Sequence, residues 1–221
     1  MDFQKYYNYW NDRGYRVGKI KFIETTRSNP QRKFFVDWVS DSNNIKSVLE
    51  IGPGEMIEYQ MLRYLRGDIK YSITDVCSEF IRNCKERFPQ VDTYKIPAER
   101  LNELDKEFDC VYESCVFEHS PDVKAAIKNS IKLAKHFHFV FFRWRWKGGG
   151  LKSRFFEKKN LCSSTFNIWK ILEEIEKYGI IEHTNVMNQR GTIYSLEEYR
   201  DISRRVKQRD GNWLAIHGRR K

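Results

Sequence analysis

The segment with the clearest chemical potential reads EIGPG at positions 50–54, directly after a run of β-forming residues. Two glycines at the end of a strand let the backbone approach a ligand closely, and a following helix offers unpaired N–H groups. Asp75 ends the next β-forming run, 25 positions after Glu50. At about this position, doubly wound sheets commonly have a carboxylate that binds the ribose hydroxyls of a ligand. The spacing predicts a ligand site at this turn, although Asp75 could instead cap the helix that begins near Ser78.

Hydrophobic periodicity predicts the elements that would position this site. The expected strands are 46–51, 70–75, 91–96, 109–114, 137–143, 180–187 and 212–217, and the expected helices are 56–66, 78–88, 122–135, 165–178 and 195–208. Strands that alternate with helices predict right-handed βαβ units. We therefore expect an α/β fold with a doubly wound, mostly parallel seven-stranded sheet and helices on both faces. The long excursion between the final two strands favours an antiparallel edge pair.

Three segments together resemble the class I S-adenosylmethionine-dependent methyltransferases. They read LEIGPGEM from residue 49, TDVCSEFI from residue 74 and FDCVYESCVFEHSPD from residue 108, in the order and spacing of the family's motifs. The similarity covers about residues 46 to 145. It implies the Rossmann-like methyltransferase fold, S-adenosylmethionine as cofactor and S-adenosylhomocysteine as product.

The resemblance also implies a set of cofactor-binding residues: Glu50, Gly52, Gly54, Asp75, Val76, Ala98 and Glu113. In the family's pattern the acidic residue of the first motif steadies the turn and the two glycines flank the methionine moiety. The aspartate holds the ribose, and the valine and the Ala98 backbone contact adenine. Two positions depart from that pattern, because Met56 stands where a third glycine is common and Pro97 where an aspartate is. A dinucleotide-binding dehydrogenase fits less well, because Ile57 occupies the place of its third glycine.

Methyl transfer is an in-line displacement in which the protein mainly aligns the acceptor with the methyl group. A general base helps when the acceptor is a hydroxyl, and His119 is the first candidate because its ordinary pKa lies near neutrality. Glu118 is the second candidate, and His119 could instead only pack beside the cofactor. Cys115 follows Ser114 in an apolar setting, which favours a structural thiol over a nucleophile. The segment after the fourth strand lacks the paired prolines of enzymes that methylate DNA amino groups.

Basic and aromatic residues alternate after the strand 137–143, where such folds build acceptor pockets. Arginine can grip phosphate or carboxylate, and aromatic rings can stack on a base or sugar. The predicted acceptor-binding residues are Tyr7, Arg143, Trp144 and Arg145. The competing interpretation is a solvated loop whose aromatic side chains dock into the core. The aromatic segment 1–15 predicts a helical lid over the pocket, or else an ordinary helix packed on the sheet edge.

The resemblance and the elements together predict one methyltransferase domain over residues 1–221. Its parts are a helical cap at 1–44, a cofactor-binding core at 45–147, and an acceptor-side elaboration with the final strands at 148–221. The five cysteines form no CxxC pair, so neither disulfides nor a metal site is predicted, and a reducing cytoplasm is the expected compartment. No apolar run is long enough to cross a membrane. The oligomeric state is left open.

The formal net charge of +10 favours an acidic partner, or simply a solvated basic surface. The leading hypothesis is O- or N-methylation of a small or glycan-like, anionic acceptor. The alternative is a nucleic-acid methyltransferase, or a non-catalytic partner protein that binds S-adenosylmethionine. We recognise no additional RNA-binding segment in the sequence, which favours the small acceptor.

Overall fold

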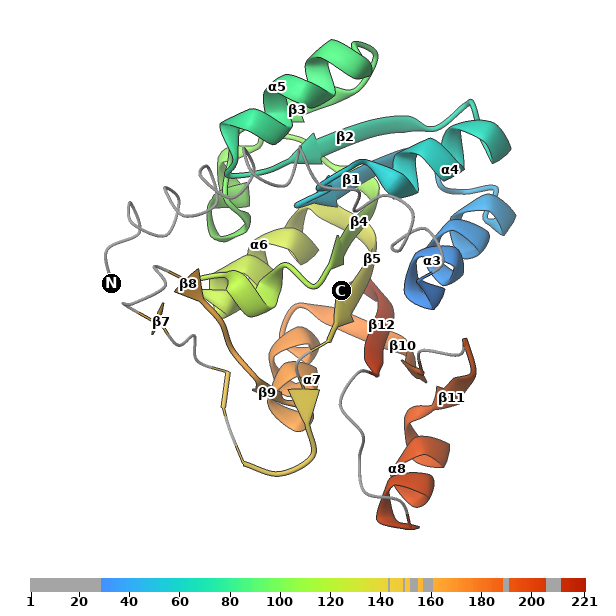
Figure 1. The fold of residues 1–221 in the computed structure, drawn as a ribbon, viewed down its shortest axis with the longest axis vertical. Helices are drawn as coiled ribbons and strands as arrows, with labels where there is room; N and C mark the ends of the chain where they lie inside the picture. The colour runs from blue at the N-terminus through green and yellow to red at the C-terminus, as the bar shows by residue number, and fades with distance from the viewer. Residues whose placement is uncertain are drawn as a thin grey trace.

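A computed structural model describes residues 29–142, 144–148, 150–151, 155–156, 161–188, 191–205 and 212–221. One mixed sheet of eight strands forms its centre, in the order β11-β10-β12-β5-β4-β1-β2-β3 (Figure 1). The strands are β1 Ser47–Ile51, β2 Lys70–Thr74, β3 Asp92–Tyr94, β4 Phe108–Ser114, β5 Ala134–Phe141, β10 Gly179–Met187, β11 Ile193–Ser195 and β12 Trp213–Arg220. Two small pairs lie apart from this sheet: β6 Trp144–Arg145 with β9 Phe166–Asn167, and β7 Phe155–Phe156 with β8 Leu161–Cys162.

The strand directions confirm the predicted mostly parallel sheet with an antiparallel edge. Strands β3, β2, β1, β4 and β5 are parallel to one another, whereas β12 runs antiparallel to both β5 and β10. The eighth strand, β11, was not predicted, because it is only three residues long, directly precedes and overlaps the expected helix 195–208 at Ser195, and pairs only with the end of β10. Strand β5 also begins at Ala134, three residues earlier than expected, where that residue pairs with Phe108 of β4.

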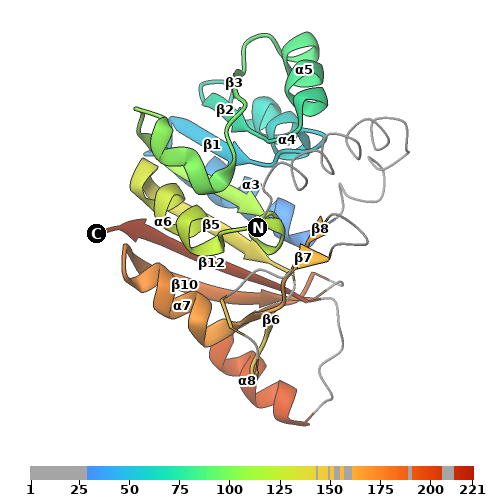
Figure 2. The same ribbon diagram turned by 90° about the vertical axis from the view of Figure 1, so that its left-hand side faces the viewer.

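Helices cover both faces of the sheet (Figure 2). They are α3 Pro30–Asp41, α4 Ile57–Leu65, α5 Ser78–Arg87, α6 Val123–Leu133, α7 Ile168–Glu176 and α8 Leu196–Arg205, with short 3₁₀ helices η1 Ala98–Glu103 and η2 Phe117–His119. The buried residues form two hydrophobic clusters, one beneath α3, α4 and α5 and the other beneath η1, α6 and α7. Alternation along a strand feeds both clusters, since Val48 joins the first while Leu49 joins the second.

Several sequence expectations lie outside the described residues. The proposed lid at 1–15 with Tyr7, the acceptor candidate Arg143, and most of the basic segment 152–160 belong to this group. Within the described part of the chain, no helix combines the length and apolarity needed to span a membrane.

Candidate cofactor and acceptor site

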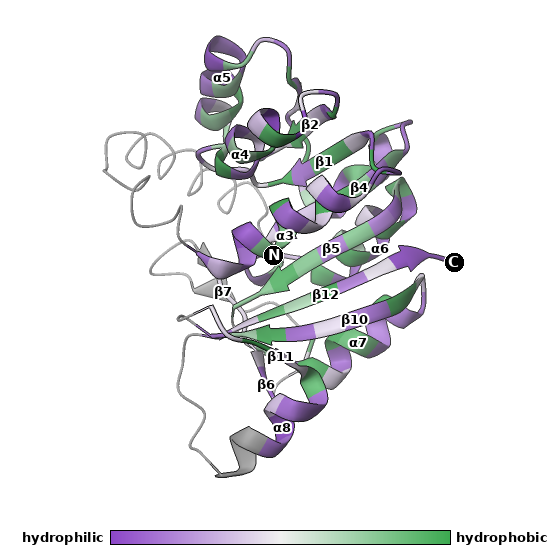
Figure 3. Cartoon of the chain, turned by 90° about the vertical axis from the view of Figure 1, so that its right-hand side faces the viewer, coloured by the Kyte–Doolittle hydropathy of each residue, from purple (hydrophilic) through white to green (hydrophobic). Residues whose placement is uncertain are grey.

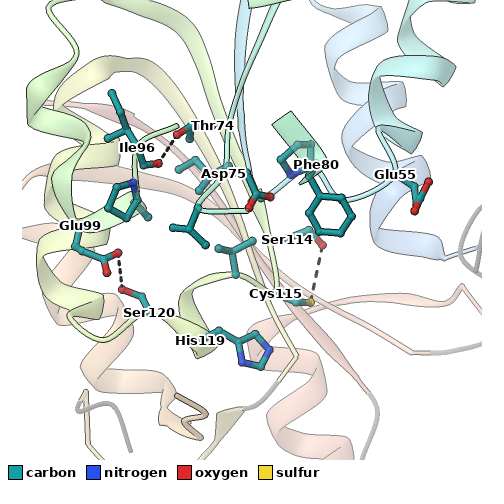
Figure 4. A pocket seen from close by; sticks show the side chains of 18 of the residues that line it. Glu55, Thr74, Asp75, Phe80, Ile96, Glu99, Ser114, Cys115, His119 and Ser120 are labelled. Atoms are coloured by element: carbon teal, nitrogen blue, oxygen red, sulfur yellow. Dashed lines mark hydrogen bonds between the residues drawn. The ribbon is translucent and has the colours of Figure 1, made fainter. Parts of the chain in front are cut away.

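A pocket opens where β1, β2 and β4 end (Figure 4). Its cavity volume is about 250 Å³, and its walls include Gly52 and Gly54 after β1, Asp75 after β2, and Cys115 after β4. Parallel strands bring their carboxyl ends to one edge of a sheet, which is the ligand-binding edge of open α/β folds. Residues that are far apart in the sequence therefore meet around one cavity.

The two glycines of the turn have different reasons for lacking a side chain. Both adopt left-handed backbone conformations, with φ of +64° at Gly52 and +52° at Gly54. A Cβ on Gly52 would lie 2.6 Å from Cγ2 of Val116, so this position permits the turns after β1 and β4 to approach each other. A Cβ on Gly54 would meet nothing within 4 Å, so that position leaves open space inside the pocket.

Met56, where the family often has a third glycine, also adopts a left-handed conformation, with φ of 61°. It precedes α4 directly, and its side chain is buried in the cluster beneath α3, α4 and α5. A non-glycine residue in this region costs about 1–2 kcal/mol. Burial of the methionine side chain offsets this strain, since a fully buried Met contributes about 1.5–3 kcal/mol.

Asp75 lies just before α5 and at the pocket, but it does not cap the helix, since the N-cap position is Cys77 and, among the described residues, no side chain caps α5. Its Oδ1 accepts a hydrogen bond of 2.7 Å from the Cys77 backbone N–H, just before α5 begins. Its carboxylate also lines the pocket (Figure 4). Burial raises the pKa of Asp75 to about 7, against the opposing effect of hydrogen bonds from backbone N–H groups. A carboxylate with this pKa can change its charge near neutral pH.

Three predicted acidic residues do not line the pocket. Glu50, Glu113 and Glu118 are at most 3% exposed, and each accepts hydrogen bonds from protein groups. Glu50 Oε2 accepts from the Tyr71 hydroxyl at 2.8 Å, and Glu118 Oε1 accepts from the Phe142 N–H at 2.6 Å. Burial raises the pKa of Glu50 well above its usual range, and the neighbouring Glu58 adds to this shift.

Glu113 connects β4, the turn after it, and β5. Its Oε2 accepts from the backbone N–H groups of Val116 at 2.9 Å and Phe117 at 3.4 Å, and its Oε1 accepts from Val140 at 3.1 Å. These bonds fix the turn that carries Cys115 and Val116 into the pocket wall. Glu113 therefore does not line the pocket itself; it positions the turn residues that do.

His119 and Cys115 both line the pocket (Figure 4). His119 ends η2, directly after the turn that Glu113 holds, and next to it the Ser120 hydroxyl donates to Glu99 at 3.2 Å. Burial raises the pKa of the Cys115 thiol well above its usual range, and the nearby Glu118 and Glu113 add to the shift. Cys115 is therefore a neutral thiol near pH 7, which agrees with its predicted non-nucleophilic role.

Sequence reasoning missed Arg32, which lines the pocket from α3. Its Nη1 donates to Glu58 Oε2, whose other oxygen accepts from the Tyr112 hydroxyl at 3.0 Å. The Arg32 Nε is buried and has no hydrogen-bond partner among the described residues. A signal was present in the sequence, because Arg32 shares a helix face with Phe35 and Val36, and an arginine on an apolar face needs a partner.

Neither described acceptor candidate lines the pocket. Trp144 is 6% exposed, its indole N–H donates to the Asn212 carbonyl at 3.2 Å, and its ring lies 5.5 Å from that of Trp146 and 6.0 Å from that of Tyr199. Trp144 thus belongs to the hydrophobic core, which is the alternative considered for the aromatic residues of this segment. Arg145 is exposed, on β6 shortly after β5 ends.

Comparison with known proteins identifies the central part of the chain. Residues 49–137 match a family described as a methyltransferase domain. No curated protein matches the chain significantly.

Solved structures resemble the whole chain at low sequence identity. An N-methyltransferase, NodS, from Bradyrhizobium japonicum WM9, solved with S-adenosylhomocysteine, is 13% identical, with a TM-score of 0.62 over 95% of this chain and 97% of that one. The 1,6-didemethyltoxoflavin-N1-methyltransferase of Burkholderia thailandensis, solved with 1,6-didemethyltoxoflavin and S-adenosylhomocysteine, is 13% identical, with a TM-score of 0.62 over 94% and 84%. A putative methyltransferase of Haloferax volcanii, in complex with the Trm112 methyltransferase activator, is 10% identical, with a TM-score of 0.64 over 96% and 95%. At these identities the likeness establishes the fold.

Proposed function

We propose that this chain, a class I S-adenosylmethionine-dependent methyltransferase, transfers the methyl group to a small, anionic acceptor. One observation carries the cofactor part of this proposal: the glycine turn, the Asp75 carboxylate and the Arg32 guanidinium meet around one cavity. These three groups match the methionine chain, the ribose hydroxyls and the carboxylate of the cofactor. The space that Gly54 leaves open, and the unpartnered Nε of Arg32, fit such a ligand.

The roles of the pocket residues follow from their chemistry. Asp75 accepts hydrogen bonds from the ribose hydroxyls in its ionised form. Val76 and Ala98 give the adenine ring an apolar wall, and Arg32 pairs with the carboxylate. When bound, S-adenosylmethionine supplies an electrophilic methyl group on a sulfonium. His119, at the end of η2, accepts the proton of a hydroxyl or amine acceptor.

Two features support an anionic acceptor: the positive charge of the protein and the basic residues that follow β5. Arg145 and Lys147 are exposed and follow β5 by a few residues. Strand β5 lies beside β4, and the end of β4 forms part of the pocket wall. Cations there would attract a phosphate or carboxylate on the acceptor, and the net charge of +10 acts in the same direction. The Bradyrhizobium and Burkholderia neighbours are N-methyltransferases, and the second was solved with a small bound molecule besides S-adenosylhomocysteine.

The test is to incubate the protein with S-adenosylmethionine carrying a labelled methyl group and with separate pools of anionic metabolites, glycans and RNA. The proposal expects label in a small anionic product. Label in RNA alone would replace the acceptor part with a nucleic-acid methyltransferase. Binding of S-adenosylhomocysteine without transfer to any pool would instead indicate a non-catalytic binding protein.

A further inference from the structure

Four of the five histidines gather on the face of the sheet that carries α3, across β5, β12 and β10. His217 lies at the centre of the group, and the ring centroids of His136, His138 and His183 are each 6.1 Å from its own. Strand register explains the arrangement, because His217 on β12 pairs with His138 on β5 and with His183 on β10. Figure 3 shows these three strands side by side.

The carboxylate of Glu182 lies next to the histidines because the pairing of β10 with β12 is irregular at this residue. The register between β10 and β12 shifts between Ile181 and His183, so Glu182 leaves the regular alternation of the strand. Glu182 Oε2 lies 3.4 Å from His217 Nε2, while its Oε1 accepts from Arg219 Nε at 3.1 Å. Arg219 therefore holds one carboxylate oxygen and leaves the other facing the imidazoles.

The spacing of these groups matches a metal site. His136, Glu182 and His217 each offer one ligand atom, and these atoms all lie within 4.8 Å of one another. Two ligands at about 2.1 Å from a tetrahedral zinc ion lie about 3.4 Å apart. The His217–Glu182 pair already has this separation. The His136 side chain needs only a small adjustment to complete the set.

Hydrogen bonding supplies a second, independent observation. His217 is 7% exposed and His138 is fully buried, yet Nδ1 of His217 and both ring nitrogens of His138 have no partner among the described residues. The Nδ1 of His136 is buried and unpartnered as well. More than about 90% of buried polar groups in proteins are satisfied by protein, water or an ion. The unpartnered ring nitrogens of His136 and His217, two members of the group formed with Glu182, point to a ligand that binds imidazole.

We propose that His136, Glu182 and His217 bind a divalent first-row transition-metal ion, with Zn²⁺ as the fitting candidate. Imidazole nitrogen and carboxylate oxygen suit such ions, and Arg219 orients the carboxylate from behind. The ion joins β5, β10 and β12 beside Trp38 of α3, whose ring centroid is 4.2 Å from that of His217. His136 is the third residue of β5, at the end of the sheet opposite the cofactor pocket, so the ion braces the sheet and takes no part in methyl transfer.

The experiment titrates Zn²⁺ into the full chain after chelator treatment and follows binding by calorimetry and by thermal melting. The expected result is one ion per chain and a melting temperature that rises with metal concentration. Glu182→Gln keeps the shape and removes the charged ligand, so it should weaken Zn²⁺ binding at least about tenfold. Glu182 is partly exposed, so this variant should fold; His217→Ala provides a second removal.

His119→Ala is the matched control, because it removes one histidine outside the cluster and leaves all three ligands. It should bind Zn²⁺ like the wild type. Binding that Glu182→Gln and His217→Ala both leave unchanged, or that His119→Ala lowers equally, would overturn the site as adventitious surface binding. S-adenosylhomocysteine affinity should be unchanged in Glu182→Gln, so a failure of the metal site is distinguishable from a failure of the proposed enzyme function.

Discussion

Replacing Asp75 with asparagine tests whether the carboxylate in the pocket holds the cofactor in its ionised form. Burial raises the pKa of Asp75 to about 7 in the free protein, and ribose hydroxyls favour the charged form. If only that form binds well, the competent fraction is about 0.1 at pH 6 and about 0.9 at pH 8. Affinity for S-adenosylhomocysteine should therefore fall about tenfold between pH 8 and pH 6, or by about 1.4 kcal/mol.

Calorimetry at several pH values measures this change directly. Buffers with different ionisation enthalpies also show whether binding releases a proton near pH 6. Asp75→Asn cannot titrate, so the variant should bind more weakly at pH 8 and lose this pH dependence. Subtracting the variant's curve removes the titration of the ligand's own amino group. An equal pH dependence in wild type and variant would refute the role of Asp75.

The raised pKa of Asp75 also makes the free energy of unfolding depend on pH. A carboxyl whose folded pKa lies above its unfolded value favours the folded state when protonated. The Asp75 contribution is therefore present below about pH 4 and is lost as the pH rises to about 7. Denaturant unfolding of the ligand-free protein should show wild type losing stability relative to Asp75→Asn over this range. A constant difference between the two proteins would contradict the shifted pKa.

Three further predictions concern the glycine turn, α3 and the end of β5. Gly52→Ala should destabilise the fold by ~2–5 kcal/mol, because its φ is left-handed and the added methyl group would clash with Val116. Gly54→Ala has only the left-handed φ and should cost ~1–2 kcal/mol. Equal shifts of the two unfolding midpoints in denaturant would contradict this difference. Arg32→Met combined with Glu58→Gln, which avoids an unpaired buried charge, should weaken S-adenosylhomocysteine binding about tenfold or more in calorimetry, and unchanged binding would remove Arg32 from the site. Arg145→Ala should raise the KM for an anionic acceptor by up to about fivefold and leave cofactor affinity intact, and unchanged steady-state kinetics would indicate a surface residue.

The sheet was largely predictable because its strands are short, apolar and separated by helices. The later part of β5, from Phe137 to Phe141, has an almost continuous apolar sequence because both faces of this strand are covered. The glycine turn and Asp75 carry local signals and were found together at one pocket. Strand β11 carries no such signal, since three residues become a strand only by pairing with β10.

Features that depend on distant contacts were harder to predict. Arg32 comes before the first motif and reaches the pocket only because α3 folds back beside α4. Trp144 looked suitable for stacking on an acceptor, but its position is determined by the Asn212 carbonyl and by core packing. The ligand set His136, Glu182 and His217 spans three strands, so no spacing rule for a metal motif could reveal it.

The most direct test of the central claim is a crystal structure of the protein with S-adenosylhomocysteine. We expect the ligand in the pocket at the ends of β1, β2 and β4, with its ribose hydroxyls within hydrogen-bond distance of Asp75. We also expect the ligand's carboxylate beside Arg32 and its sulfur on the side of the pocket where His119 lies. A ligand bound elsewhere, or a ribose without contact to Asp75 in this pocket, would show that the proposed site is wrong.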